Sequence, residues 1–436
     1  MSLHELPTVW NVYNLRGSPF FQDTLLNGHD RYSLDLFVGR ANELAALRAH
    51  LRGRDSSRQA VAGTSGVGKT TLVQMLKAEA LRDGYLTADS LVPFVTGDTP
   101  EAFFGRVLNA VYDIILANRP RARAHPAMQA AQQMVRAARF ETGGASVSAL
   151  GVGGGITRGV TIVTPKDILI DGPRVLRDLL TLVLNSDARG LLLHLNNLES
   201  LSGRDLSRAA DLLQSLRDPM FMHEGLHVVL VGTTDAVNDV LGAHPQVRNV
   251  FRAPLVLDPL SLAEVHALLM ARYEGWRLDD RLPVHAPVEG AAVDRLFEAF
   301  QGDLRGLLKA LDDGVEECIG MGAPELGGEV VTTSAGVPPV ALHDLARVLQ
   351  ARYAAVMRGE LDDTRIEQLD RWAMDDPDAS RTQRDLMELW DLSQGTVSTA
   401  LSALDDTGYV IAHPRQGNAP IHYTLSGKSR VVAGLA

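Results

Sequence analysis

Cysteine is almost absent from this sequence, since Cys318 is the only one among 436 residues. A single thiol can form no disulfide within the chain and builds no zinc cluster. Long apolar runs are also missing: runs such as 191–193 and 228–231 are far too short to cross a bilayer and indicate buried strands. The first residues show no basic stretch followed by an apolar one, so no secretory signal is visible. These absences predict a cytoplasmic protein without membrane spans.

Basic residues are in the minority. The chain has 42 Lys and Arg against 53 Asp and Glu, which gives a net charge of -11. Such an acidic chain is not expected to bind nucleic acids indiscriminately over its surface, although it can still have a local basic face. With 45% hydrophobic and 22% charged residues, the composition is that of a globular protein of two or three domains.

Strand-like and helix-like segments alternate up to residue 258. This alternation predicts an α/β domain over residues 1–258, with a largely parallel sheet that helices cover on both faces. Pro93 favours an edge position or a strand end for the second strand, because proline has no N–H to donate. The predicted strands are 59–62, 91–95, 190–195, 227–231 and 254–257.

Glycine density and a change of pattern divide the rest of the chain. Residues 141–165 place many glycines among Val, Ile and Thr, which predicts a glycine-tipped β-hairpin inserted in the α/β domain. A flexible linker is the alternative for this segment. After Pro259 the pattern is helical, which predicts a helical domain over residues 259–325. A Gly- and Pro-rich linker then leads to a third domain over residues 339–436.

A glycine-rich loop follows the first predicted strand and opens a helix. Gly63 to Thr70 match the pattern Gly-x-x-x-x-Gly-Lys-Thr, and this context distinguishes a phosphate-binding loop from a glycine turn without a ligand. Backbone N–H groups and the positive end of the helix dipole surround phosphates in such a loop. We expect Lys69 to bridge the β- and γ-phosphates of ATP and Thr70 to hold Mg²⁺. The predicted contacts to ATP or ADP are Thr64, Ser65, Gly66, Val67, Gly68, Lys69, Thr70 and Thr71.

Carboxylates are missing where P-loop proteins that hydrolyse nucleotides usually carry them. The buried strand that should end in an acidic residue near the metal is followed by Asn196 and Asn197. A neutral Asn leaves the charge of the metal less compensated, and an amide cannot act as a general base. Two interpretations stay open: slow hydrolysis with ATP as a switching ligand, or a carboxylate from another residue. The candidates for that carboxylate are Asp171, Glu199 and Asp235.

Two segments around the loop carry a family resemblance. Phe37, Val38, Gly39 and Arg40 precede the loop, with Glu43 and Leu44 at a fixed distance behind them. This pattern resembles the VGR-x-x-E-L segment of AAA+ ATPases of the origin-recognition initiator type and of the related STAND signalling ATPases, in which it borders the adenine pocket. Pro259-Leu260-Ser261-x-x-Glu264 is similar to the start of the helical lid in these families.

The same resemblance implies roles for three sets of residues nearer the phosphates. Gly302-Asp303-Leu304-Arg305 is similar to the sensor 2 motif, in which the arginine, here Arg305, reaches the γ-phosphate from the lid. Thr233 to Asp235 occupy the sensor 1 region, and Thr234 is the candidate for orienting the attacking water. Arg248 and Arg252 lie where an arginine of oligomeric relatives can reach the nucleotide of a neighbouring subunit. The alternative for each of these arginines is an ordinary surface position.

The last predicted domain resembles a winged helix-turn-helix. A helix over 380–392 is followed by Ser393 as the N-cap of a second helix. Two β-segments after that helix are joined by a turn that contains Arg415. Basic residues are few, so we expect weak or avidity-dependent binding to DNA, and protein contact is the alternative. The predicted DNA-binding residues are Gln394, Thr396, Ser398, Thr399, Arg415 and Gln416, above the buried Val397, Leu401 and Leu404.

Together these features predict a P-loop NTPase parallel sheet with a helical lid and a C-terminal winged helix-turn-helix domain. The predicted function is that of an ATP-binding AAA+ switch that needs Mg²⁺, binds double-stranded DNA, forms homo-oligomers and hydrolyses ATP slowly. One alternative is a STAND-like signalling ATPase whose winged helix binds a protein partner. The other is an active motor ATPase.

Overall fold

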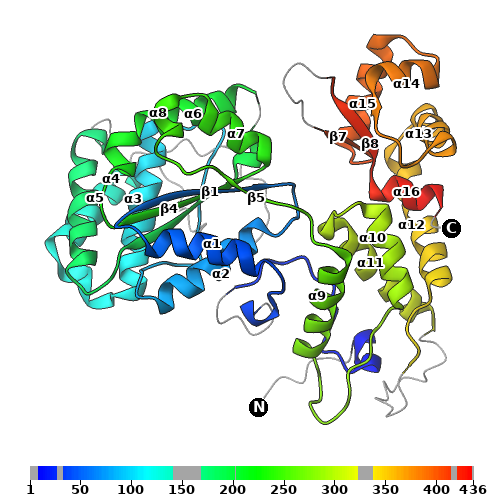
Figure 1. The fold of residues 1–436 in the computed structure, drawn as a ribbon, viewed down its shortest axis with the longest axis horizontal. Helices are drawn as coiled ribbons and strands as arrows, with labels where there is room; N and C mark the ends of the chain where they lie inside the picture. The colour runs from blue at the N-terminus through cyan, green and yellow to red at the C-terminus, as the bar shows by residue number, and fades with distance from the viewer. Residues whose placement is uncertain are drawn as a thin grey trace.

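The computed structural model describes residues 8–26, 33–140, 168–201, 203–322, 337–413 and 420–434. The predicted glycine-rich hairpin over 141–165 lies outside these residues, and so do Arg415 and Gln416 of the predicted turn. A domain built on a parallel sheet, a helical lid and a C-terminal domain follow one another along the chain (Figure 1). None of the helices in the described ranges combines the length and apolar character that a membrane span requires.

A five-stranded sheet forms the centre of the first domain, in the order β2-β3-β4-β1-β5. Every neighbouring pair of strands is parallel, as the alternation of strands and helices predicted. Pro93 lies on the edge strand β2, where its missing N–H interrupts no ladder. Because the strands are parallel, the segments that follow β1, β3 and β4 meet at one edge of the sheet. The bounds are β1 Ser57–Gly63, β2 Val92–Pro93, β3 Leu191–Asn196, β4 Leu226–Gly232 and β5 Leu255–Leu257.

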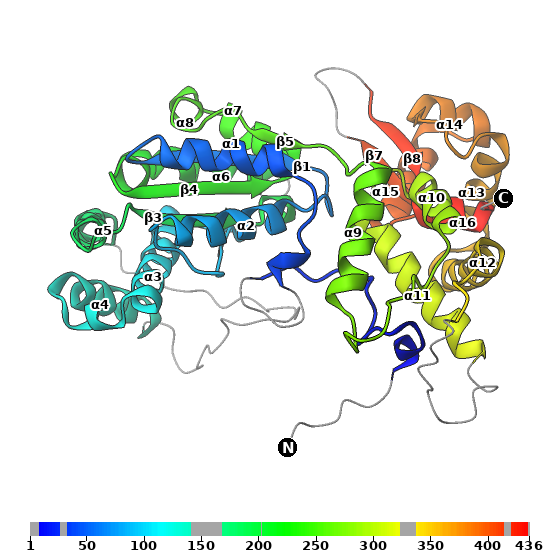
Figure 2. The ribbon, with the colours of Figure 1, turned by 60° about the horizontal axis from the view of Figure 1, so that its bottom comes forward.

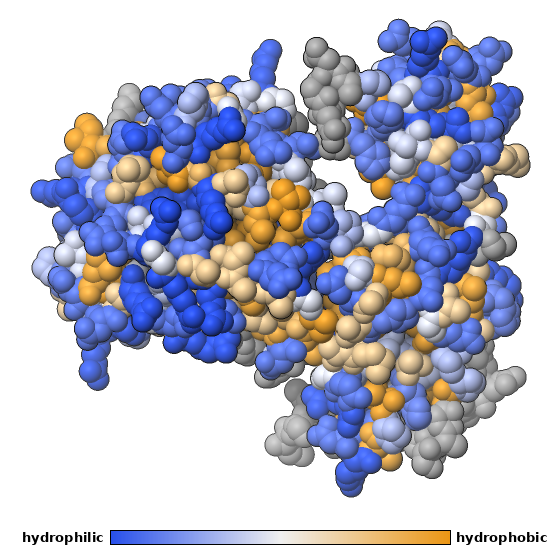
Figure 3. All heavy atoms as spheres, in the orientation of Figure 1, coloured by the Kyte–Doolittle hydropathy of each residue, from blue (hydrophilic) through white to orange (hydrophobic). Residues whose placement is uncertain are grey.

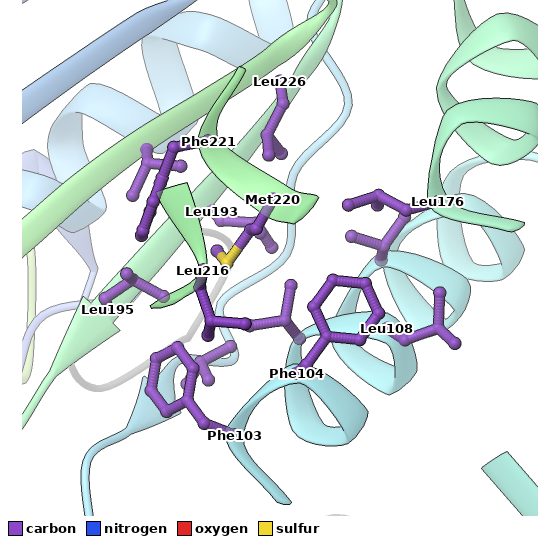
Figure 4. Packing of buried hydrophobic residues seen from close by; sticks show 14 of the residues in the cluster. Phe103, Phe104, Leu108, Leu176, Leu193, Leu195, Leu216, Met220, Phe221 and Leu226 are labelled. Carbon is purple, nitrogen blue, oxygen red and sulfur yellow. The ribbon is translucent and has the colours of Figure 1, made fainter. Parts of the chain in front are cut away.

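Alternate side chains of β1, β3 and β4 pack against helices on opposite faces of the sheet. Leu193 and Leu195 of β3 belong to the core under α3 and α5, and Phe103 and Phe104 of α3 point toward them (Figure 4). Leu192 packs instead with the side chains of α1 and α2. The helices are α1 Ala41–Arg52, α2 Lys69–Arg82, α3 Pro100–Asn118, α4 Pro126–Phe140, α5 Ile168–Leu184, α6 Arg204–Ser215, α7 Thr234–Gly242 and α8 Pro245–Arg248.

The lid consists of α9 Leu262–Gly275, α10 Gly290–Phe300 and α11 Leu304–Gly322. Ser261 and Glu264 form a capping box that starts α9. On the face of Figure 3, hydrophobic residues gather near the middle, where the sheet domain meets the lid.

The described N-terminal residues pack with the lid, although the predicted division grouped residues 1–36 with the sheet domain. The 3-10 turn Val9–Tyr13 lies beside α11 (Figure 2). Asn14 donates from Nδ2 to the backbone oxygens of Asp279 (2.9 Å) and Leu282 (3.0 Å). Arg272 of α9 is buried and donates to the Phe21 oxygen (2.8 Å). This segment therefore supplies part of the lid core.

The C-terminal domain is a winged helix, as predicted. Its three-stranded antiparallel sheet has the order β6-β8-β7. The predicted helix over 380–392 begins later than expected, because Arg381 and Thr382 form a short strand paired with β8 and Thr382 then caps α14. The elements are α12 Leu342–Glu360, α13 Asp363–Asp375, β6 Arg381–Thr382, α14 Gln383–Trp390, α15 Gln394–Asp406, β7 Val410–His413, β8 His422–Leu425 and α16 Gly427–Ala433.

Candidate nucleotide-binding site

The glycine-rich loop joins β1 to α2 at the carboxyl edge of the sheet. Gly66 (φ 79°) and Gly68 (φ 94°) have the left-handed backbone that favours glycine, and α2 begins directly behind them at Lys69. Thr64 and Ser65 are exposed at the loop tip, whereas Thr70 and Thr71 are half-buried in the first turn of α2. The first N–H groups of α2 therefore face the loop, which is the arrangement that binds phosphate.

Lys69 lies inside this loop. Its Nζ donates hydrogen bonds to the backbone oxygens of Gly63 (3.0 Å) and Thr64 (2.8 Å). Burial lowers the pKa of Lys69, the negative charge of Glu199 raises it and the positive charge of Arg305 lowers it. The ammonium group therefore lies within electrostatic reach of two other predicted site residues.

Arg40 ties the segment before α1 to the loop. The residue has a left-handed backbone (φ 61°) and a buried side chain, which forms an ion pair with Glu43 (3.1 Å). Its Nη2 donates to the Val67 oxygen (3.4 Å) and to the Asp258 oxygen at the end of β5. Phe37 and Val38 are half-buried against the lid core, and Phe37 also contacts the α1–α2 core.

The turn between α10 and α11 lies directly against the loop. A Cβ added to Gly66 would lie 3.1 Å from Cβ of Arg305 and 3.2 Å from Oδ1 of Asp303. Asp303 also accepts a hydrogen bond from the Gly306 amide (3.1 Å), which fixes the start of α11. The side chain of Arg305 is exposed, so its guanidinium is free to face the mouth of the loop.

The end of β3 presents amides beside the loop. Asn196 is half-buried, and its Oδ1 is enclosed with no hydrogen-bond partner among the described residues. Asn197 has a left-handed backbone (φ 77°), and its Nδ2 donates to the Phe94 oxygen (3.4 Å). The side chain of Asn197 therefore points toward the segment after β2. Glu199 is exposed, and its charge is the one that raises the pKa of Lys69.

The other two candidate carboxylates occupy different surroundings. Asp235 lies in the first turn of α7, behind β4, and burial and the charge of Asp239 raise its pKa. In the same turn Thr233 caps the helix through the Ala236 amide (3.4 Å), and Thr234 is half-buried. Asp171 is exposed on α5, which packs on α3. Of these two carboxylates, Asp235 is the one that follows a strand neighbouring both β1 and β3.

Arg248 and Arg252 are both exposed, and Arg252 lies at the opposite edge of the sheet from the loop. The Arg252 amide donates to the Arg58 oxygen (3.0 Å) at the start of β1, and its charge adds to the burial that lowers the pKa of His50. The strand from Arg58 to the loop spans about 16 Å at 3.3 Å a residue. Arg252 therefore does not serve the nucleotide of its own chain.

The helix α15 presents the predicted polar residues to solvent. Gln394, Thr396, Ser398 and Thr399 are all exposed, and Ser393 accepts from the Thr396 amide (3.4 Å) as N-cap. The buried side of the helix is also as predicted, with Val397, Leu401 and Leu404 in the core of the domain. The sequence of α15 contains neither Lys nor Arg, and it ends in Asp405 and Asp406.

Sequence reasoning did not identify the neighbours of the sensor-like turn. Gly302 lies against Pro259, and Phe300 lies between the lid and α16. Only the spacing of glycines in this turn could have drawn attention to it. Among the described residues, no three or more His, Cys, Asp and Glu side chains come together in a group that could hold a metal ion.

Comparisons with known proteins agree with the geometry of this domain. The sequence profile of the AAA ATPase domain family matches residues 36–231. The matched residues contain the Phe37 segment, the glycine-rich loop and β3, and they end in β4. A search of curated proteins found no match.

Solved structures similar to this chain include three archaeal proteins. The ORC2 protein of Aeropyrum pernix in ADPNP-ADP complexes is 14% identical, with a TM-score of 0.42 over 96% of this chain and 98% of that chain. The ORC1 protein of Aeropyrum pernix in complex with DNA is 16% identical, with a TM-score of 0.41 over 92% and 93%. Cdc6p from Pyrobaculum aerophilum is 14% identical, with a TM-score of 0.40 over 98% and 96%.

Proposed function

We propose that this chain is an ATP-binding AAA+ switch protein that acts on double-stranded DNA through its C-terminal winged helix. The observation that carries the proposal is the contact of Gly66 in the loop with Asp303 and Arg305 of the lid. Lys69 and Arg305 are the residues that would hold the terminal phosphate, and Thr70 would hold Mg²⁺. Because one of these cations belongs to the sheet domain and the other to the lid, ATP and ADP would favour different lid positions.

We further propose that hydrolysis is slow. Asn196 ends β3, where the resident acid of such a site would be expected, and Nδ2 of Asn197 donates to the Phe94 oxygen. The two carboxylates nearest in the fold, the exposed Glu199 and Asp235 behind β4, are less suited to the role of the usual acid, because neither ends the strand β3. The competing function, an active motor ATPase, predicts steady-state turnover of about 1 per second or more, which a phosphate-release assay measures directly.

DNA binding is supported by the exposed polar face of α15. Gln394 and Thr396 lie in its first turn, where a recognition helix meets base edges. Since α15 has no cation, we expect weak binding by a single chain and tighter binding by an assembly. Arg252 lies too far from its own loop and would serve the neighbouring subunit of such a homo-oligomer.

One observation favours a second candidate function, a signalling ATPase whose winged helix binds a protein. The exposed face of α15 carries no charge before the exposed Asp405 and Asp406, with which the helix ends. Such a surface suits hydrogen bonding to a protein as well as to base edges.

The deciding experiment measures affinity for duplex DNA at two salt concentrations, with and without ATP, alongside the state of assembly by sedimentation. We expect tighter DNA binding and a larger assembly with ATP, and a weaker response in Lys69→Ala. DNA binding that Lys69→Ala leaves identical would contradict the switch. Absence of salt-dependent DNA binding in every state would favour the protein partner.

A further inference from the structure

The turn from Phe300 to Gly306 touches three other parts of the molecule at positions where a glycine leaves room. Gly66 of the phosphate-binding loop lies against Asp303 and Arg305. Gly302 lies against Pro259, which connects β5 to the lid. A Cβ added to Gly302 would lie 2.6 Å from Cβ of Pro259. Gly427, the first residue of α16, lies against the ring of Phe300. One short turn thus borders the nucleotide site, the connection to the lid and the winged helix.

The ring of Phe300 makes the contact to the winged helix. It is 6% exposed, and one edge of it lies between two glycines. A Cβ added to Gly427 would lie 2.2 Å from Cδ1 of the ring, and a Cβ added to Gly306 would lie 2.5 Å from the same atom. Neither glycine can gain a methyl group unless the ring or the helix moves.

The helix on the far side of this contact is fixed to the rest of the C-terminal domain. α16 packs against α12 and α13 as well as α10. Ser429 of α16 donates to the Tyr409 oxygen (2.6 Å), and the buried Arg430 pairs with Asp378 (3.1 Å). A displacement of the α10–α11 turn is therefore passed to α16, and through these contacts to the segments on both sides of α14 and α15.

We propose that Phe300 is a positioning residue that couples the nucleotide state at Arg305 to the orientation of the winged helix. The inference rests on the proposed nucleotide switch and adds the route by which the switch reaches α15. When the turn follows the terminal phosphate, the ring carries α16 with it, because one edge of the ring packs against both Gly306 and Gly427. The winged helix then turns with the lid as one body.

The test introduces a steric clash between α16 and the Phe300 ring and then removes the ring. Gly427→Ala forces α16 away from the ring, and Phe300→Ala added to it removes the ring that the new methyl group meets. Gly359→Ala is the matched control, since Gly359 lies on α12 with open space around its Cα. Hydrogen–deuterium exchange of the full chain, with and without ATP, reports α11 and α16 separately, and thermal unfolding shows that each variant is folded.

In the wild type and in Gly359→Ala we expect ATP to slow exchange in both α11 and α16, on the order of threefold. In Gly427→Ala the response of α11 and the affinity for ATP should remain, and the response of α16 should be lost. The double variant removes the clash and the ring together, so α16 should pack without strain while its response to ATP stays lost, and a regained response would overturn the coupling through Phe300. An α16 response that survives in Gly427→Ala overturns the proposal, and so does a wild type in which ATP protects α11 alone. A wild type that binds no ATP instead overturns the proposed function itself.

Discussion

Two helix N-termini in this molecule lie in very different surroundings. α2 begins behind Gly68 with its first N–H groups turned into a loop, and Lys69 is buried beside them. α15 begins behind Ser393, and its first residues Gln394 and Thr396 are exposed. Both helices offer the positive end of a dipole, which is worth about 0.3 to 1 kcal/mol at an exposed terminus.

The difference lies in what stands around each terminus. At α2 the buried cation Lys69 lies inside the loop and Arg305 lies against it, and a hydrogen bond to a buried charged group is stronger than one in open water. At α15 no cation belongs to the helix, and Asp405 and Asp406 stand at its other end. We therefore expect the groups around α2 to hold a phosphate without help, whereas α15 would need contacts from elsewhere.

Removal of the lysine in the phosphate-binding loop should have the largest effect on binding at the two helix N-termini. Lys69→Ala leaves the loop backbone and takes away its buried cation, so we expect ATP affinity to fall about 100-fold, or about 2.7 kcal/mol. Titration with a fluorescent ATP analogue measures the loss. Lys309→Ala is the matched control, because Lys309 lies on α11 in an exposed pair with Asp313. An affinity that stays within twofold of wild type would show that phosphate is held elsewhere.

The lid arginine should matter next. Arg305→Ala removes a cation that the resemblance places at the γ-phosphate, so we expect the preference for ATP over ADP to fall about 30-fold. Affinity for ADP should change little, and this distinguishes a γ-phosphate contact from general loosening of the lid. Arg281→Ala, at an exposed position of the lid connection, serves as control. Equal losses for ATP and ADP would contradict the assigned role.

A carboxylate at the end of β3 tests the hydrolysis half of the proposal. Asn196→Asp places a negative charge where Asn196 has an enclosed Oδ1 without a partner in the described structure. We expect turnover to rise about tenfold, which is about 1.4 kcal/mol of barrier. The measurement is phosphate release at saturating ATP and Mg²⁺, with Asn197→Asp as comparison. A wild type that already turns over rapidly, with no gain in the variant, would favour the motor ATPase.

Local patterns predicted most of the sheet domain and much of the site. The loop from Gly63 to Thr70, the strand before it and the amides behind β3 are each encoded by neighbouring residues, so periodicity and spacing were sufficient. The polar and buried sides of α15 could also be predicted locally, because the helical period places Thr396 on the exposed side and Val397 on the buried side.

Long-range contacts could not be predicted in this way. Asn14 bonds to Asp279, 265 positions away, so nothing local shows that the N-terminal segment belongs to the lid. Strand β6 forms because Arg381 pairs with Tyr423 of β8. A strand of two residues is too short to show an alternation of polar and apolar residues in the sequence. The contact between Phe300 and Gly427 likewise depends on how two domains pack.

The smallest expected effect comes from giving α15 the cation that it lacks. Thr396→Lys adds one positive charge at an exposed position of the first turn, beside the dipole end that would face DNA. If this helix approaches the duplex, the added lysine should neutralise one phosphate, and the plot of log affinity against log salt should become steeper by about 0.9. The matched control is Lys at Ser402, an exposed residue later in the same helix, where little change in slope is expected. An unchanged slope in Thr396→Lys, with DNA still bound, would mean that another surface meets the phosphates, because a cation within the interface must release a counterion.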